Sequence, residues 1–143
     1  CRALANDKIM LLLKPGEHGS TFGGNPLAAA VVVAALEVVK DEKLAANAER
    51  LGVIFRERMN AIKKKSDIIT LVRGKGLLNA ILINDSPESE TAWNLCLKFA
   101  EKGLLAKPTH GNIIRLAPPL VITEEQIHEC CDIIESCLLA FKK

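Results

Sequence analysis

Residues 18–26 read HGSTFGGNP, and this stretch separates a polar loop from a long apolar helix. Its glycines allow positive φ and a close approach of the backbone to a ligand. The hydroxyls of Ser20 and Thr21, together with nearby amides, are natural donors to an oxyanion such as phosphate. Asn25 is a good helix N-cap, and Pro26 suits the first helical position. The pattern predicts either a phosphate-binding loop or a glycine-rich turn that caps a buried helix, and spacing alone does not separate the two.

Two helices are expected after this loop. Residues 26–40 are apolar almost all round, which predicts a deeply buried helix. A second helix is expected to run to about residue 64, because apolar residues recur there at steps of three and four. Its predicted apolar face comprises Leu44, Ala48, Leu51, Phe55, Met59 and Ile62. Before the loop, the short apolar run 9–13 is interpreted as a strand or as the edge of a core segment.

From residue 68 onward the pattern changes and predicts an α+β unit. Residues 68–72 and 77–83 are rich in Ile, Leu and Val and are expected to be strands. The segment between them, 73–76, reads RGKG and is interpreted as a tight turn or a bulge that contains Arg73 and Lys75. Further strands are expected at 104–106 and 113–116.

Two more helices complete this unit. One is expected over residues 89–102, with its core face formed by Trp93, Cys96, Leu97 and Ala100. The last begins at a capping box made by Thr123 and Gln126 and continues to about residue 141. Its predicted apolar face comprises Ile127, Cys130, Ile134, Cys137, Leu138 and Phe141. The order strand–strand–helix–strand–strand–helix favours a mainly antiparallel sheet covered by helices.

Composition excludes several classes of function. The 143 residues are 49% hydrophobic with a net charge of +2, so the chain can bury a sizeable core. Aromatic residues make up only 3%, and the one basic run ends a predicted helix, which argues against a nucleic-acid partner. No apolar run is long enough to cross a membrane. The five cysteines follow neither a disulfide framework nor a zinc pattern, which indicates free thiols, a reducing compartment and no metal site.

Arg115 is the strongest candidate for chemistry outside the glycine loop. It lies in the predicted strand 113–116 with apolar neighbours on both sides. A guanidinium that faces a cleft there would suit bidentate capture of a carboxylate. An edge-strand arginine in solvent, or one held in a structural ion pair, remains an equal alternative. His110 lies in a loop, where a surface or hydrogen-bonding role is favoured over catalysis.

Three segments together resemble the class III pyridoxal-phosphate aminotransferases, which are enzymes of fold type I. They are residues 14–27 (KPGEHGSTFGGNPL), 72–78 (VRGKGLL) and 105–120, which contains AKPTHG and IIRLAPPL. The third segment is most similar to the ornithine branch of the family, rather than to its acetylornithine and GABA branches. The resemblance implies an α/β fold, with residues 1–40 as the C-terminal end of the large cofactor-binding domain. Residues 41–66 would be a connecting helix, and residues 67–143 an α+β small domain.

The resemblance also implies ligands and partners. The cofactor would be pyridoxal 5'-phosphate, whose phosphate Ser20 and above all Thr21 would reach in the other subunit of a homodimer. Arg115 would bind the α-carboxylate of glutamate and 2-oxoglutarate. The substrates would be ornithine and 2-oxoglutarate, and the products glutamate-5-semialdehyde and glutamate. An acetylornithine or GABA aminotransferase, or a non-catalytic small-domain module, stays open as an alternative. The expected compartment is the mitochondrial matrix, with the cytoplasm as the alternative.

One family residue is missing from this chain. Transamination needs a lysine that forms a Schiff base with the cofactor, and in this family it precedes the glycine loop. Lys14, Lys75 and Lys107 occupy positions with no such family role. The chain therefore resembles the C-terminal third of such an enzyme, contains no catalytic residue of its own, and is expected to be inactive alone.

Overall fold

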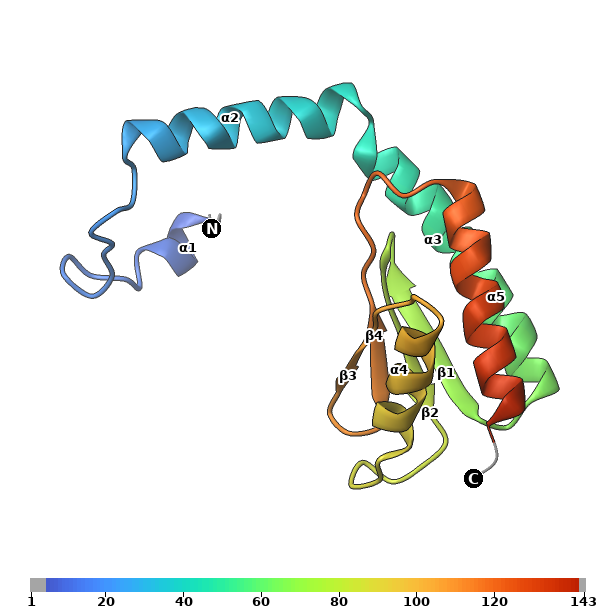
Figure 1. Cartoon of the computed structure of the whole chain (residues 1–143). Helices are drawn as coiled ribbons and strands as arrows, with labels where there is room; N and C mark the ends of the chain where they lie inside the picture. Colours follow the sequence, from blue (N-terminus) through green and yellow to red (C-terminus); the bar gives the residue numbers. More distant parts are fainter. Residues whose placement is uncertain (1–4, 142–143) are drawn as a thin grey trace. The chain divides into compact units, whose positions relative to one another are not determined.

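The computed structural model describes residues 5–141, and the chain divides into two compact units, Cys1–Val38 and Val39–Lys143. The first unit contains helix α1 (Asp7–Met10), a loop, and most of helix α2 (Pro26–Asp41) (Figure 1). The strand expected over residues 9–13 is wrong. The carbonyl of Asn6 accepts hydrogen bonds from the amides of Ile9 and Met10, at 3.0 and 2.9 Å, which closes helical turns instead.

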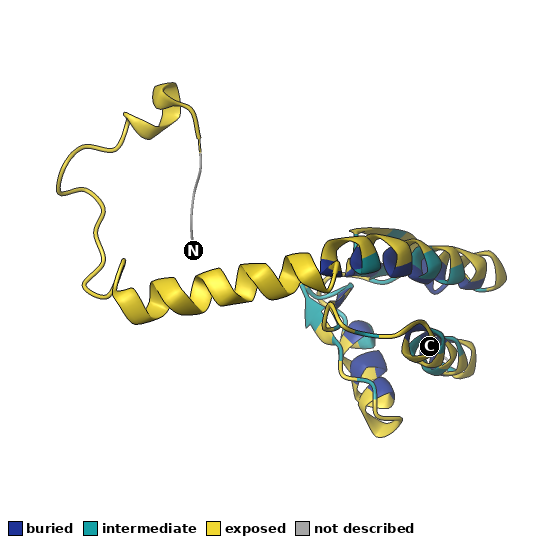
Figure 2. Ribbon diagram, turned by 90° about the horizontal axis from the view of Figure 1, so that it is seen from above, coloured by how far each residue is buried: buried dark blue, intermediate teal, exposed yellow. Residues whose placement is uncertain are grey.

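Helix α2 begins at the predicted residue and ends one residue later than predicted, at Asp41, but it does not have the predicted burial. Pro26 begins it, and all of its residues are exposed (Figure 2). The apolar residues on every side leave the helix without a polar face. Within residues 5–141 nothing covers these side chains, so the expectation of a deeply buried helix is wrong for this chain taken alone.

The second unit is built on a four-stranded antiparallel sheet with the strand order β1-β2-β4-β3. The strands are β1 (Ile69–Lys75), β2 (Leu78–Ile83), β3 (Lys107–Thr109) and β4 (Ile113–Leu116). The helices are α3 (Leu44–Lys65), α4 (Thr91–Glu101) and α5 (Glu124–Ala140). This order of elements confirms the predicted α+β unit with helices packed on an antiparallel sheet (Figure 1).

Two strand boundaries differ from the prediction. Strand β1 continues through the RGK segment to Lys75, and the hairpin turn consists of Gly76 and Leu77. Gly76 has a φ of 53°, the left-handed region that glycine tolerates best. Strand β3 lies at 107–109 rather than 104–106, because the amide of Leu104 bonds to the carbonyl of Phe99 and completes the end of α4.

The hydrophobic core lies between the sheet and its three helices. The predicted face of α3 is confirmed, since all six of its named residues are buried. In α4 the predicted face is confirmed at Cys96, which is buried, and wrong at Trp93, Leu97 and Ala100, which are exposed. Trp93 and Leu97 are 53% and 46% exposed, while the buried residues are Ala92, Leu95, Cys96 and Phe99.

In helix α5 most of the predicted apolar face is confirmed, since Ile127, Ile134, Cys137 and Leu138 are buried. Thr123 and Gln126 form the predicted capping box, with reciprocal bonds of 3.3 and 3.0 Å. Cys131 is fully buried, and Cys130 is only partly buried. The prediction had placed Cys130 in the core, and the neighbouring cysteine takes that position.

Candidate functional site

The two faces of the sheet differ in character. One face packs against the helices through the buried residues Asn79, Ile81, Ile83, Ile114 and Leu116. The other face is open, because side chains alternate along each strand. Cross-strand partners on this open face form one row: Arg73 lies opposite Ala80, Ala80 opposite Arg115, and Arg115 opposite Lys107.

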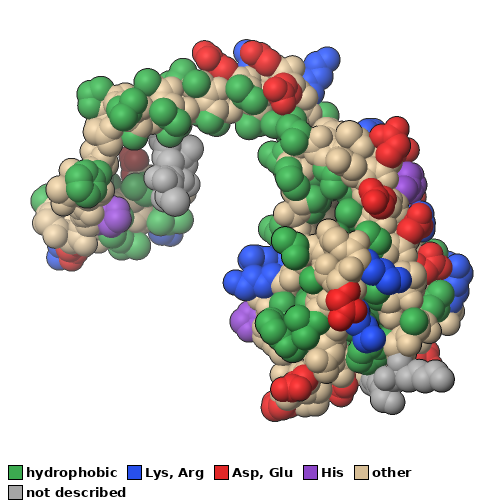
Figure 3. Space-filling model, in the orientation of Figure 1, with side chains coloured by type: hydrophobic (Ala, Val, Ile, Leu, Met, Phe, Trp, Pro, Cys, Tyr) green, Lys and Arg blue, Asp and Glu red, His purple; other side chains and the backbone are tan. Residues whose placement is uncertain are grey.

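Arg115 lies between two hollows of the surface. The larger has a volume of about 410 Å³, and its lining includes Arg73, Ala80 and His110. The smaller has a volume of about 250 Å³ and includes Lys107. Among residues 5–141, no aspartate or glutamate lines either hollow. Figure 3 shows Lys and Arg side chains beside a histidine on this unit. Both hollows are therefore suited to anions.

The arginines of the described chain fall into two groups. Arg50 pairs with Glu124, Arg58 pairs with Asp132, and Arg56 donates to the carbonyl of Gly76 at 2.9 Å and to Asn79. Within residues 5–141, neither Arg73 nor Arg115 has an ion-pair partner or a side-chain hydrogen bond.

The structural ion pair considered for Arg115 is thus not observed in this part of the chain. Its guanidinium is exposed and free to meet an external carboxylate in bidentate geometry.

The glycine loop holds its own shape through local hydrogen bonds. The amide of Gly23 donates to the hydroxyl of Ser20 at 3.0 Å, and a Cβ at Gly23 would lie 3.0 Å from the Ser20 Cβ. The side-chain oxygen of Asn25 accepts from the amide of Ala28 at 2.8 Å, which confirms the predicted N-cap. Gly24 has a φ of 76°, where a side chain would be strained.

The same loop presents hydroxyl donors that fit a phosphate. Ser20 accepts one bond within the loop but keeps its own hydrogen for a further acceptor. Thr21 is exposed, and no described residue engages its hydroxyl. Ser20 and Thr21 lie in the first unit and Arg115 lies in the second.

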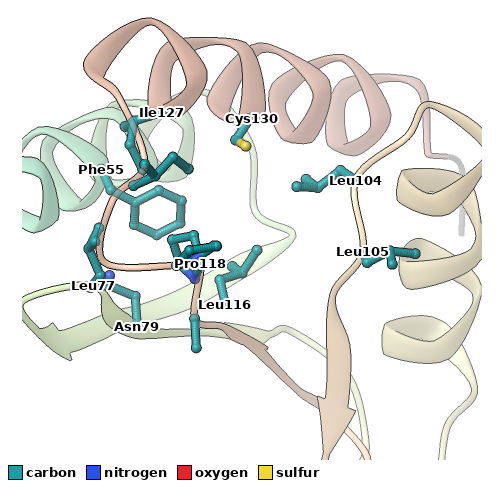
Figure 4. A pocket seen from close by; sticks show the side chains of 12 residues that line it. Phe55, Leu77, Asn79, Leu104, Leu105, Leu116, Pro118, Ile127 and Cys130 are labelled. Atoms are coloured by element: carbon teal, nitrogen blue, oxygen red, sulfur yellow. The ribbon is translucent and has the colours of Figure 1, made fainter. Parts of the chain in front are cut away.

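A third cavity, of about 300 Å³, is apolar and lies beside α3 and α5 (Figure 4). Its lining includes Phe55, Leu104 and Leu116, and its polar side chains are those of Asn79 and Cys130. Burial raises the pKa of the Cys130 thiol, so this group is a poor nucleophile. The cavity offers no acid–base pair.

Metal and membrane sites are not found in the described chain. Over residues 5–141 no group of three or more His, Cys, Asp or Glu residues could hold a metal ion. Over the same range, no helix is both long enough and apolar enough to cross a bilayer.

Sequence reasoning missed one member of the open face. Arg73 was interpreted as a turn residue, whereas the structure places it in β1 directly opposite Ala80. No regular alternation marks this strand, because its pairing with β2 shifts register between Ile69 and Leu71, and Gly74 favours a turn. Lys75, also predicted in the turn, lies in β1 and pairs with Glu49 at 3.0 Å.

Comparison with known proteins identifies a family and several relatives that match this chain. Residues 2–138 match the family described as Aminotransferase class-III. The curated protein named ornithine aminotransferase, mitochondrial, from Rattus norvegicus is 55% identical over 138 residues. This match covers 96% of this chain and 31% of the rat protein. Ornithine aminotransferase from Emericella nidulans is 58% identical over 134 residues, which are 93% of this chain and 29% of that protein. The chain thus spans about a third of the length of these relatives.

Solved structures agree with the fold. The crystal structure of acetylornithine aminotransferase from Elizabethkingia anophelis has a TM-score of 0.87 at 68% identity, and covers 96% of this chain and 34% of that one. The ornithine δ-aminotransferase of Plasmodium falciparum has a TM-score of 0.83 at 50% identity, covering 96% and 35% respectively. The match along residues 2–138 and these likenesses in structure establish that the chain belongs to the class III aminotransferase family.

Proposed function

We propose that this chain forms part of a pyridoxal-phosphate enzyme that transfers the δ-amino group of ornithine to 2-oxoglutarate. The products are glutamate-5-semialdehyde and glutamate. Family membership and the curated relatives named ornithine aminotransferase support this assignment. When bound, pyridoxal phosphate supplies the electron sink that allows an amino group to leave one carbon and join another. The relatives from rat and Drosophila melanogaster carry mitochondrial names, so the mitochondrial matrix is the proposed compartment and the cytoplasm the alternative.

Ser20 and Thr21 hold the cofactor phosphate in this proposal. Two hydroxyl donors on a loop preformed by the Gly23–Ser20 bond meet a phosphate dianion with little loss of conformational freedom. As the family resemblance suggests, they reach the phosphate in the other subunit of a homodimer. A complete active site then needs two chains.

Arg115 orients the substrate in this proposal. A planar guanidinium binds the α-carboxylate of glutamate or 2-oxoglutarate through two parallel hydrogen bonds, which fixes direction as well as affinity. The observation that carries the assignment is that Arg115 is exposed, has no ion-pair partner among the described residues, and lies between two hollows that no described carboxylate lines. The Schiff-base lysine lies outside this chain, so the 143 residues alone are proposed to be inactive.

N-acetylornithine is a second candidate for the amino donor, and one solved structure supports it. The solved structure at 68% identity is that of an acetylornithine aminotransferase. Acetylornithine keeps the carboxylate of ornithine but carries a neutral amide in place of the α-amine. Arg115 would act on glutamate and 2-oxoglutarate in the same way in both enzymes. The choice between the two donors is therefore a matter for residues other than Arg115.

A donor assay tests the proposal. The complete protein that contains these residues is mixed with pyridoxal phosphate, 2-oxoglutarate and one of three amino donors, ornithine, N-acetylornithine or γ-aminobutyrate, and glutamate is quantified. We expect kcat/KM to be higher with ornithine than with N-acetylornithine. A preference for N-acetylornithine or for γ-aminobutyrate would change the assigned amino donor but would leave the assignment as an aminotransferase intact. If no glutamate forms with any of these donors, the enzymatic role is contradicted and a non-catalytic module is favoured.

A further inference from the structure

Arg56, Gly76 and Asn79 close a ring of three hydrogen bonds where the β1–β2 hairpin meets α3. The Nη1 atom of Arg56 donates to the carbonyl of Gly76 at 2.9 Å and to the side-chain oxygen of Asn79 at 3.0 Å. The side-chain nitrogen of Asn79 donates to the same Gly76 carbonyl at 3.1 Å. Asn79 is only 3% exposed, and Arg56 is half-buried. We call these three residues the hairpin clamp, because they join the helix, the turn and strand β2.

The backbones at the hairpin clamp lie too close together for the hairpin to shift along the helix. A Cβ at Gly52 of α3 would overlap the carbonyl oxygen of Gly76. A Cβ at Gly74 would overlap the side-chain oxygen of Asn79. Only glycine allows so close an approach at both positions, and the interior leaves no room for a second arrangement. The hairpin is therefore held at one position on α3.

Strand β2 transmits this fixed position to Arg115. In the sheet order β1-β2-β4-β3, β2 lies between its hairpin partner and β4. Asn79 pairs directly with Leu116, and the next residue, Ala80, pairs with Arg115. Asn79 and Leu116 also lie together in the wall of the apolar cavity (Figure 4). The other neighbour of β4 is the three-residue edge strand β3, so β2 is what connects β4 to the rest of the sheet.

We propose that Asn79 and Arg56 are positioning residues for Arg115, which they act on through the backbone of β2. This inference rests on the proposed function, in which Arg115 binds the carboxylate of 2-oxoglutarate. The side chain of Asn79 bonds to α3 on the face opposite to Arg115, so its contribution to binding is indirect. Bidentate contact between a guanidinium and a carboxylate depends on direction as well as distance. A displacement of about 1 Å in a binding group can lower a rate by about 100-fold, so a small shift of β4 is enough to matter.

Steady-state kinetics of the complete protein separates positioning from general stability. Ornithine and 2-oxoglutarate act in turn in the proposed reaction, so each substrate has its own kcat/KM. Loss of folded protein lowers both values by the same factor, whereas a misplaced Arg115 lowers the value for 2-oxoglutarate. The variants are Asn79→Ala, Arg56→Gln and the conservative Arg56→Lys. Thr123→Ala is the matched control, because it removes a structural hydrogen bond of α5 and none of the hairpin clamp.

We expect the ratio of kcat/KM for 2-oxoglutarate to that for ornithine to fall about 10-fold or more in Asn79→Ala and Arg56→Gln. The fall should be smaller in Arg56→Lys, which keeps a charged donor, and absent in Thr123→Ala. An unchanged ratio in Asn79→Ala and Arg56→Gln would overturn the inference and leave the hairpin clamp a purely structural role. If these two variants yield no folded protein, the milder Arg56→Lys decides by the same ratio.

Hydrogen exchange followed by mass spectrometry gives a second readout that does not depend on activity. Peptides that cover β4 should exchange faster in Asn79→Ala than in the parent, whereas Thr123→Ala should accelerate exchange in α5 only. Exchange of β4 equal to that of the parent would contradict the inference. If the parent protein transfers no amino group, the proposed function is refuted, and exchange at β4 still decides whether the hairpin clamp holds Arg115 in place. If the parent is active but neither the ratio nor the exchange changes, the proposed function stands and the inference fails.

Discussion

Asn79 is the one buried polar side chain of the described core, and removing its amide is the sharpest structural perturbation that the chain offers. Its carbonyl oxygen accepts from Arg56 Nη1 at 3.0 Å, and its amide nitrogen donates to the carbonyl of Gly76 at 3.1 Å. Arg56 Nη1 also donates to the same carbonyl at 2.9 Å. The three groups fix the β1–β2 hairpin against α3, and this hairpin carries Arg73 and Ala80 beside Arg115.

The expected cost of Asn79→Ala follows from these contacts. Loss of the bond to a charged guanidinium costs about 1.5–3 kcal/mol, and loss of the neutral bond about 0.5–1.5 kcal/mol. The free energy of unfolding should fall by about 2–4 kcal/mol. With a urea m-value of about 2 kcal/mol/M for a domain of this size, the midpoint should move down by about 1–2 M.

Equilibrium urea denaturation of the 143-residue chain, followed by far-UV circular dichroism, measures this change. Asn60→Ala is the matched control, because Asn60 is exposed on α3 and alanine there is expected to be neutral or slightly stabilising. A double-mutant cycle of Asn79→Ala with Arg56→Gln should give a coupling energy of at least about 1 kcal/mol. A loss under about 0.5 kcal/mol for Asn79→Ala, or no coupling with Arg56, would refute the reasoning.

Two further predictions concern the loop and the buried thiols. Thr21→Val replaces a hydroxyl donor by a methyl group, so the complete protein should retain less pyridoxal phosphate after desalting; retention equal to that of the parent would count against the phosphate role. Burial raises the pKa of Cys131 to about 12 and that of Cys96 to about 11, so both thiols stay protonated at pH 8. A thiol reagent should modify these two residues only after denaturant is added, and rapid labelling of Cys96 or Cys131 in the native chain at pH 8, located by peptide mapping, would contradict their placement in the core.

Local patterns predicted the elements that depend on neighbouring residues. The three- and four-residue recurrence in α3 identified all six of its buried positions, and the Thr123–Gln126 capping box located the start of α5. In α4, apolar residues occur on more than one side, so periodicity alone selected Trp93 and Leu97 rather than Leu95 and Phe99. Which apolar stripe faces the core is decided by the sheet against which the helix packs.

The features that the sequence did not predict depend on contacts between residues far apart in the chain. The RGK segment has the composition of a turn, yet Arg73 and Gly74 pair with Ala80 and Asn79 and continue β1. The apolar helix α2 was expected to be buried, but its cover is not among the described residues of this chain. For the candidate site, Arg115 was identified from its strand context, whereas Arg73 needed the register of the sheet.

Steady-state kinetics of Arg115→Ala in the complete protein tests the central claim most directly. Loss of a bidentate charged contact, at about 1.5–3 kcal/mol for each charged hydrogen bond, should lower kcat/KM for 2-oxoglutarate by about 100-fold or more. Retention of pyridoxal phosphate should be unchanged, because the residues proposed to hold its phosphate are Ser20 and Thr21 rather than Arg115. Equal kcat/KM values for the variant and the parent with 2-oxoglutarate would contradict the claim that Arg115 holds the substrate.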